Sequence, residues 1–287
     1  MAVDVLRMHE PPTPPAEHFN KAILSCFGKT TSGVDGGQLR TTVAVVGAGF
    51  VGLHLIKAFS SRHCVIAYDI DERRLKELPL SGVGEDVLCT ANPEHLRSAD
   101  HLLVAVPTKV NHDNTINTSA VQSAIDMIAQ YAKDGATVVI ESSVAVGMTR
   151  ELLRPIVNLR EFRGGMSPER VDPGRVFPSF QSIPKIVSGL DDMAPGSLEV
   201  IYDLYSTVFS EVVPVSSPEV AEMTKLYENC QRMINIAYAN EMADACSKAG
   251  INPLEVSRAA ATKPFGYQPY TPSLGVGGMS LPSRDQF

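Results

Sequence analysis

The sequence lacks a basic excess, a secretion signal and any apolar run long enough to cross a membrane. Its net charge of −7 leaves no basic face that would attract nucleic acid or an anionic membrane. Polar residues break every hydrophobic stretch well before the ~20 apolar residues that a transmembrane helix needs. The N-terminus has no basic-then-apolar segment, and its acidic residues argue against a transit peptide. We therefore expect a cytoplasmic protein that binds neither nucleic acid nor membranes.

Cysteine is also scarce, and its spacing argues against both disulfides and a metal centre. The five cysteines are odd in number and scattered, and no two of them form a C-x-x-C pair. They are Cys26, Cys64, Cys89, Cys230 and Cys246. This pattern predicts reduced thiols in a cytosolic protein. The 287 residues, 44% of them hydrophobic, suffice for one large domain or two moderate ones.

The most informative stretch is a glycine-rich turn after a run of β-branched residues, Thr41-Thr-Val-Ala-Val-Val-Gly47-Ala-Gly49-Phe-Val-Gly52. The pattern G-x-G-x-x-G between a strand and a helix is typical of dinucleotide-binding turns. Gly47 allows a sharp reversal, Gly49 lets a pyrophosphate approach the backbone, and Gly52 lets the helix pack on the strand. The helix N-terminus offers free N–H groups to the phosphates. We count Phe50 and Val51 among the predicted cofactor contacts.

An acidic residue follows the next predicted strand at the spacing that a dinucleotide fold requires. Asp69 ends the segment 64–69 and lies 22 residues after Gly47, where about 20 are expected. A carboxylate there would accept hydrogen bonds from the adenosine ribose and would repel a 2′-phosphate, which favours NAD over NADP. Arg73 and Arg74 lie just beyond and weaken that preference; Arg74 is also a predicted cofactor contact.

Predicted strands and helices alternate from Thr41 onward, which is typical of an α/β protein with a mostly parallel sheet. We expect strands over 64–69, 87–90, 101–108, 135–143, 184–189 and 211–215, and helices over 50–60, 71–78, 118–131 and 198–208, with another helix beginning near Gly147. The segment 162–174 is rich in turn-forming and charged residues. Ligands of such sheets lie at the carboxyl ends of the strands, where Asp69, Pro107, Thr108 and Glu141 fall. The predicted fold is a Rossmann-type doubly wound parallel sheet followed by an all-helical dimerisation domain.

A long helix is predicted after residue 216. Ser217-Pro218-Glu219 combines a capping serine, a proline at the first helical position and an acid in the first turn. No helix breaker follows before Gly250, which gives a helix of ~48 Å at 1.5 Å per residue. Its apolar face is predicted to include Val220, Met223, Leu226, Met233 and Ala237. A helix of this length usually packs against a symmetry mate, so we expect a homodimer through residues 218–249.

Lys225 and Asn229 lie four residues apart on this helix and share a face with Arg232. On spacing alone they fit a solvated polar face. Alternatively, the ammonium and the amide point into a cleft beside a nicotinamide, where they hold a substrate hydroxyl and stabilise an alkoxide.

The chain is predicted to divide into three parts. They are a disordered tail over 1–38 with four prolines, an NAD-binding domain over 39–216 and a helical domain over 217–287.

Several motifs, in order from about residue 41 to 282, resemble the UDP-glucose/GDP-mannose dehydrogenase family. The sequence is most similar to the branch that oxidises UDP-N-acetylmannosamine or UDP-N-acetylglucosamine. The matching pieces are Val-Gly-Ala-Gly-Phe-Val-Gly52, Val-Pro-Thr108, Glu141-Ser-Ser, Ser167-Pro-Glu-Arg-Val-Asp-Pro-Gly174, Pro184-Lys-Ile-Val-Ser-Gly189, Val213 to Asn229 and Ala259-Ala-Ala-Thr-Lys-Pro-Phe-Gly266. The resemblance implies an NAD domain, a helical dimerisation domain, and a four-electron oxidation of a UDP-sugar C6 alcohol with two NAD.

The resemblance also assigns roles to single residues. It implies that Thr108 and Glu141 line the cofactor and active site, with Glu141 near the water-handling groups. Glu169 and Arg170 match a loop that faces substrate. Lys225 would stabilise an alkoxide or oxyanion, and Asn229 would position substrate and water.

Two departures from the family pattern bear on activity. The family's glycine-rich loop carries a cysteine that attacks the aldehyde, whereas here the loop is Gly275-Val-Gly-Gly-Met279-Ser280. Because a serine hydroxyl ionises far less readily than a thiol, we expect the second oxidation to be lost or crippled at Ser280. From the length of the chain we expect the family's third domain, which grips the UDP, to be missing, as in a diverged non-catalytic form or a truncated product.

Three functions remain open at this point. The first is an NAD-dependent UDP-sugar dehydrogenase with impaired activity. The second is an NAD-binding pseudoenzyme that serves as a dimerisation module. The third is a single-step hydroxyacid dehydrogenase of the 6-phosphogluconate or 3-hydroxyisobutyrate type, which would use Lys225 and Asn229 without a cysteine. The motifs Ser167-Pro-Glu-Arg-Val and Ala-Thr-Lys-Pro-Phe-Gly argue against the third.

Overall fold

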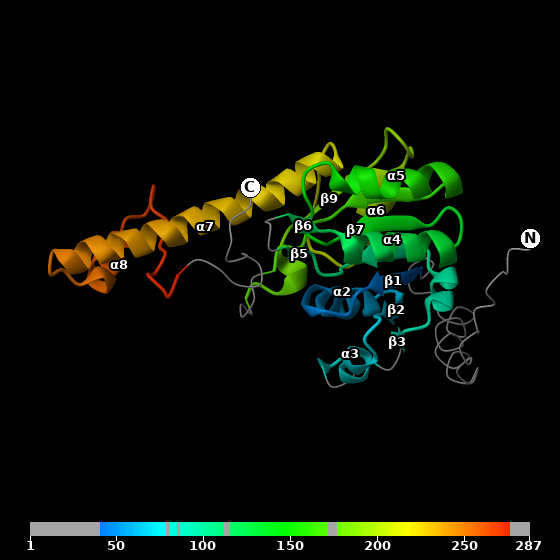
Figure 1. Cartoon of the computed structure of the whole chain (residues 1–287), viewed down its shortest axis with the longest axis horizontal. Helices are drawn as coiled ribbons and strands as arrows, with labels where there is room; N and C mark the ends of the chain where they lie inside the picture. Colours follow the sequence, from blue (N-terminus) through cyan, green and yellow to red (C-terminus); the bar gives the residue numbers. More distant parts are fainter. Residues whose placement is uncertain (1–40, 79–80, 85–86, 112–114, 172–176, 276–287) are drawn as a thin grey trace, which may run out of the picture.

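The computed structural model describes residues 41–78, 81–84, 87–111, 115–171 and 177–275. Its main sheet contains the strands β1 (Thr42–Val46), β2 (Cys64–Tyr68), β3 (Val87–Thr90), β4 (His101–Val104), β7 (Thr137–Ile140), β8 (Arg163–Met166), β9 (Lys185–Gly189) and β10 (Val212–Pro214). The helices are α2 (Phe50–Ser60), α3 (Glu72–Glu77), α4 (Ser119–Tyr131), α5 (Met148–Arg160), α6 (Ser197–Ser206), α7 (Pro218–Lys248) and α8 (Pro253–Ala260), with short 3₁₀ turns η3 (Pro93–Ser98) and η4 (Phe180–Ser182). These elements confirm the predicted class, a Rossmann-like domain followed by a helical region (Figure 1).

The main sheet has the strand order β10-β9-β8-β7-β4-β1-β2-β3. Six neighbouring strands, β8, β7, β4, β1, β2 and β3, are parallel. The chain order of the strands runs outward in opposite directions from β1 and β4, as in the dinucleotide-binding folds. The sheet is mostly parallel, as predicted, and departs from this at one edge: β9 runs antiparallel to β8, and β10 runs parallel to β9. The beginning of β9 therefore lies at the same sheet edge as the carboxyl ends of β7 and β8.

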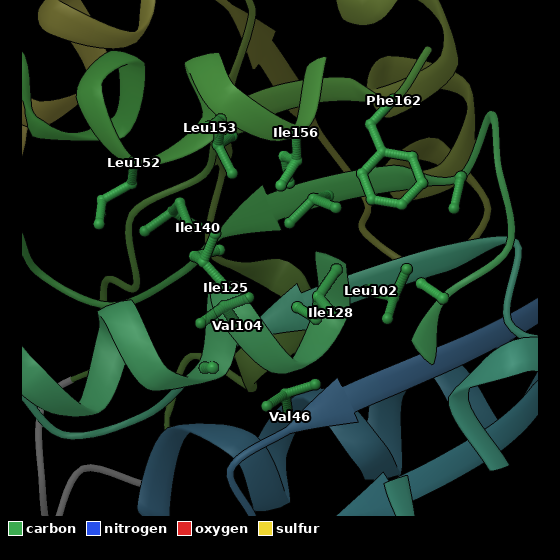
Figure 2. Close-up of a cluster of buried hydrophobic side chains, with 14 of the residues drawn as sticks. Val46, Leu102, Val104, Ile125, Ile128, Ile140, Leu152, Leu153, Ile156 and Phe162 are labelled. Carbon is green, nitrogen blue, oxygen red and sulfur yellow. The ribbon is translucent and has the colours of Figure 1, made fainter. Parts of the chain in front are cut away.

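Helices cover both faces of the sheet, and side chains of the strands alternate between them. In β1, Ala44 and Val46 join the core beneath α4 and α5, whereas Val43 and Val45 join the core beneath α2 and α6. Figure 2 shows the first of these cores, in which Ile125 and Ile128 of α4 and Leu153 of α5 lie over the sheet. These buried faces hold the strand ends, and hence the site, in register.

Strand β8 was not expected from the sequence, since its Arg-Gly-Gly-Met sequence is typical of a turn. The structure gives the reason for its glycines. A Cβ on Gly165 would lie 2.0 Å from the Ser188 carbonyl oxygen of β9, and one on Gly164 would lie 2.8 Å from Leu153. The strand needs glycine because its neighbours approach too closely for a side chain. The short hairpin of β5 (Lys109–Val110) and β6 (Ile116–Asn117) was not predicted either.

The long helix is confirmed as α7, and it projects away from the sheet with α8 near its far end (Figure 1). Ser217 occupies the N-cap position, but its side chain makes no capping hydrogen bond, contrary to the prediction. In the single chain, Val220 and Met223 of the predicted apolar face are exposed and its other three residues are half-buried. Ala221, Glu222 and Lys225 are buried instead. The helix thus turns charged side chains toward the Rossmann domain, and their partners are described below.

Several predictions fall on residues outside the described ranges. They are the disordered tail 1–38, the segment 172–174 of the family motif, and the loop with Met279 and Ser280. Within the described part, no helix is both long and apolar enough to span a bilayer.

Candidate active site

The glycine turn joins β1 to α2 at the carboxyl edge of the sheet. Gly47 has a φ of +99°, in the region that favours glycine, and its N–H donates to the Tyr68 carbonyl oxygen at 2.8 Å. A Cβ on Gly52 would lie 1.8 Å from the Gly47 carbonyl oxygen, so helix and turn pack directly on each other. A Cβ on Gly49 would meet only the Arg74 guanidinium, at 3.7 Å. Backbone atoms therefore crowd Gly47 and Gly52, whereas only a flexible arginine side chain lies near Gly49.

Asp69 fastens this turn from the end of β2. One carboxylate oxygen accepts the Ala48 N–H at 2.8 Å, and the other accepts the Asp71 N–H at 2.9 Å. The side chain is 6% exposed, and Arg74 lies 3.8 Å away. The carboxylate thus holds the turn in shape. Each carboxylate oxygen can accept more than one hydrogen bond, so both oxygens can also accept one from a ligand.

The ends of β4 and β7 form the next part of this edge. The Glu141 and Ser142 N–H groups both donate to the Val104 carbonyl oxygen, at 2.9 and 3.1 Å. Pro107 and Thr108 follow β4; the proline is exposed and the threonine is half-buried. The strand-end residues predicted from the sequence therefore do converge on one edge of the sheet.

Glu141 does not face an open cleft but forms a fully buried network. Its carboxylate accepts a hydrogen bond from the Lys185 ammonium at 2.6 Å and another from the Tyr205 hydroxyl. Glu141 is 0% exposed and the Lys185 side chain is 4% exposed. Burial raises the pKa of the Glu141 carboxyl, and its contacts with Lys185 and Tyr205 oppose that rise. Burial and the neighbouring Glu141 likewise raise the pKa of Tyr205 well above its usual value.

Lys225 of α7 forms a second buried ion pair with the loop after β8. Its ammonium donates to Glu169 Oε1 at 2.6 Å, and Glu169 Oε2 accepts the Val171 N–H at 2.7 Å. The two side chains are 5% and 12% exposed, respectively. Of the two interpretations of the α7 polar stripe, a solvated face is therefore wrong for Lys225. The helix presents its ammonium to the loop that the resemblance assigns to substrate.

Neighbouring polar contacts tie the same loop to α7. Arg170 donates to both Glu228 carboxylate oxygens, at 2.5 and 3.3 Å, and to the Pro184 carbonyl oxygen at 2.9 Å. On α7, Arg232 donates to Asn229 Oδ1 at 3.0 Å, and Asn229 is half-buried. Loop and helix are thus joined by several charged contacts on one side of the site.

Glu222, one turn before Lys225, anchors the base of α7 to the Rossmann domain. Its carboxylate accepts the Gly147 N–H at 2.6 Å and the Thr149 N–H at 2.8 Å at the beginning of α5, and it is 1% exposed. Burial raises the pKa of this carboxyl. A carboxylate at a helix N-terminus satisfies free N–H groups and favourably meets the helix dipole. Lys225 is therefore placed by a firmly attached helix.

Sequence reasoning missed Lys185, Tyr205 and Glu222. A signal existed for Lys185, since a lysine at the first position of an otherwise apolar strand requires a partner once the strand is buried. For Tyr205 and Glu222 the helical spacing gave no such signal, because their partners lie 64 and 73 residues away in the sequence.

The residues present fit a dinucleotide. The backbone at Gly49, which only the Arg74 guanidinium approaches, the free N–H groups of the first turn of α2 and the Asp69 carboxylate are the parts that phosphates and a ribose require. No cluster of three or more His, Cys, Asp or Glu side chains suited to a metal occurs among the described residues. The fold and this edge define a dinucleotide-binding protein of the Rossmann class.

Comparison with known proteins identifies the family. Residues 41–209 match the NAD binding domain of the UDP-glucose/GDP-mannose dehydrogenase family, and residues 219–286 match the central domain of that family. The chain therefore belongs to the UDP-glucose/GDP-mannose dehydrogenase family, which confirms the resemblance and the prediction of NAD.

Individual relatives agree with this assignment. Protein CapL of Staphylococcus aureus is 36% identical over 259 residues, which cover 84% of this chain and 60% of the relative. UDP-N-acetyl-D-glucosamine 6-dehydrogenase of Pseudomonas aeruginosa is 33% identical, with coverage of 82% and 60%. The structure of the UDP-D-ManNAc dehydrogenase of Pyrococcus horikoshii superimposes with a TM-score of 0.72 at 30% identity, with coverage of 83% and 61%. The chain thus spans about 60% of the length of these curated relatives.

Proposed function

We propose that this chain is an NAD-dependent dehydrogenase that oxidises the C6 alcohol of a UDP-sugar of the N-acetylmannosamine or N-acetylglucosamine type. The buried Lys225–Glu169 ion pair beside the carboxyl ends of the strands supports this proposal most directly, because a buried ammonium can stabilise an alkoxide. The names of the relatives supply the substrate class. The proposal also places the protein in the cytoplasm.

The first oxidation requires a proton and a hydride to leave the substrate. The C6 hydroxyl would bind beside Lys225 and Asn229, whose ammonium and amide stabilise the developing negative charge on oxygen. Loss of the hydroxyl proton to solvent and of the C6 hydride leaves an aldehyde. NAD, held by Gly47, Gly49, Phe50, Val51, Gly52 and Asp69, with Arg74, Pro107 and Thr108 nearby, supplies the hydride acceptor.

The second oxidation is the step that we expect to be weak. In the family pattern a cysteine thiolate attacks the aldehyde, and the corresponding position here is Ser280. A serine hydroxyl is almost never ionised at neutral pH and is a poor nucleophile unless a base activates it. The proposed product is therefore an aldehyde rather than a carboxylate.

The test measures NADH formed per sugar by the purified chain with NAD and a panel of UDP-sugars. One equivalent with accumulating aldehyde is the expected result, and two equivalents would refute the assignment of Ser280. Lys225→Ala should lower kcat by about 10²- to 10³-fold, as loss of an oxyanion donor does elsewhere. Lys248→Ala, at the exposed end of the same helix, is the matched control.

A second candidate, an NAD-binding pseudoenzyme, is favoured by the serine at position 280. NAD binding in a titration, together with no NADH from any UDP-sugar, would select it. Small hydroxyacids belong in the same panel, since their turnover without UDP would instead indicate a single-step hydroxyacid dehydrogenase that uses Lys225 and Asn229.

A homodimer through α7 completes the proposal. Tyr227, Ile234, Tyr238 and Met242 form one apolar stripe on α7 and are 72%, 63%, 59% and 43% exposed. Exposed apolar surface of this extent is typical of an association face. Light scattering should give twice the chain mass, and Ile234→Glu should give a monomer; a monomeric parent chain would contradict the proposal.

A further inference from the structure

The Lys185 ammonium is held in one position by three acceptors. It donates to Glu141 Oε2 at 2.6 Å, to the Pro168 carbonyl oxygen at 3.2 Å and to the Ser167 carbonyl oxygen at 3.3 Å. An ammonium has three N–H donors, so every donor is used. Lys185 also lies over the Tyr205 and Phe209 rings, at 5.6 and 5.8 Å from their centroids. This buried charge therefore has no free donor to offer a ligand.

Two of the three acceptors belong to the loop that carries Glu169. Ser167 and Pro168 directly precede Glu169, and the Ser167 hydroxyl also donates to the Ile186 carbonyl oxygen at 2.8 Å. The beginning of β9 thus contacts this loop through both Lys185 and its neighbour. The direction in which the chain leaves β8, and hence the position of the Glu169 carboxylate, depends on these contacts.

Stability alone does not account for this network. A buried ion pair is a weak source of stability, because desolvation offsets much of its attraction. What it does provide is a fixed geometry, since a fully satisfied buried network has few alternative arrangements. Here the fixed element is the backbone beside Glu169, whose carboxylate meets the Lys225 ammonium at 2.6 Å.

We propose that Lys185, anchored by Glu141 and Tyr205, is a positioning residue for Lys225: it holds the Ser167–Pro168 backbone so that Glu169 meets the Lys225 ammonium. Glu141 then acts on the reaction indirectly, through Lys185, and does not touch the substrate. This inference rests on the proposed function, which assigns the alkoxide contact to Lys225.

The test compares variants that remove the loop contacts with variants that keep them. Glu141→Gln combined with Lys185→Met removes both buried charges and leaves the two loop carbonyls without their donor. Lys185→Met alone, in which the buried Glu141 carboxyl can take up a proton, is a second variant of this kind. Tyr205→Phe disturbs the same network but keeps Lys185 on the loop, and Lys185→Arg restores a cation with several donors.

The first readout is hydrogen exchange of the Val171 amide, which donates to Glu169 and so reports the position of that carboxylate. We expect at least 10-fold faster exchange in the double variant and no such change in Tyr205→Phe. The Val45 amide in β1 serves as the fold control. Unchanged Val171 exchange in both Lys185→Met variants would overturn the positioning role, whether or not the chain turns over substrate.

The second readout links the loop to the reaction. In a chain that forms NADH, the double variant should lower kcat at least 10-fold with the KM for NAD unchanged, and Lys185→Arg should recover most of kcat. Faster Val171 exchange with unchanged kcat would overturn the link to Lys225. If the parent chain forms no NADH, the proposed function fails separately, and a crystal structure of the double variant decides the inference. A broken Lys225–Glu169 contact supports it, and an intact contact refutes it.

Discussion

Glu222 attaches α7 to the Rossmann domain, and its contacts determine how much stability the chain should lose when this side chain is removed. Replacing Glu222 by alanine removes the acceptor of the Gly147 and Thr149 N–H groups at the beginning of α5. Both hydrogen bonds are charge-assisted, and the site is almost fully buried, so water does not readily replace the carboxylate.

Each hydrogen bond to a charged group contributes about 1.5 to 3 kcal/mol, and relief of the buried carboxylate's desolvation offsets part of the loss. We therefore expect Glu222→Ala to lower the free energy of unfolding by about 3 to 5 kcal/mol. Glu222→Gln keeps one acceptor oxygen, but its amide N–H₂ faces the second backbone N–H, so it should lose roughly half as much.

Urea denaturation followed by circular dichroism measures this difference. Glu241→Ala, at an exposed position on the same helix, is the matched control and should change the free energy of unfolding by less than ~0.5 kcal/mol. A loss below ~1 kcal/mol for Glu222→Ala would refute the reasoning, because two buried N–H groups would then have found other partners without cost.

Three further predictions concern the glycine turn and the base of α7. Gly52→Ala places a Cβ 1.8 Å from the Gly47 carbonyl oxygen and should cost about 3 kcal/mol and abolish NAD binding, as measured by denaturation and calorimetric titration. Asp69→Ala should weaken NAD binding about 10- to 100-fold, since it removes both the ribose acceptor and the anchor of the turn; unchanged affinity would contradict this. The Arg150 guanidinium, which donates to Glu219 at 2.7 Å, lowers the pKa of Glu219 from 4.5 to about 2. Because the folded value lies below the unfolded one, this contribution is present above about pH 4.5 and is lost as the pH falls toward 2. The parent chain should therefore lose roughly 1 kcal/mol more than Glu219→Gln over that range, after allowance for solvent screening.

The elements that depend only on residues close together in the sequence could be predicted from the sequence. The glycine turn was predicted from the spacing of its glycines, and α7 from the proline at its start and the absence of helix breakers. Strand β8 was missed because its glycines respond to β9 and α5, which lie close in space but not in sequence. The strand β9 was predicted, but its antiparallel direction depends on the same contacts between distant segments and could not be predicted.

The same distinction applies to the candidate site: single residues could be found from the sequence, but their ion-pair partners could not. Asp69 was singled out from its spacing to Gly47, whereas the helical spacing of Lys225 to Asn229 fitted a solvated face, and only the resemblance assigned Lys225 its role. Neither pattern could show that Glu141 pairs with Lys185 or that Lys225 pairs with Glu169, because each pairing depends on how strands and helices are brought together. Ion pairs between distant segments require the tertiary arrangement itself.

The uninterrupted course of α7 has a mechanical consequence. From Glu219 to Lys248 the helix contains neither proline nor glycine, so no point along it is a natural hinge. Its base is fastened by Glu222 and Lys225, whereas the exposed stripe lies farther along the same rod. A force applied at the α8 end is therefore transmitted to the Lys225–Glu169 contact as a tilt of the whole helix.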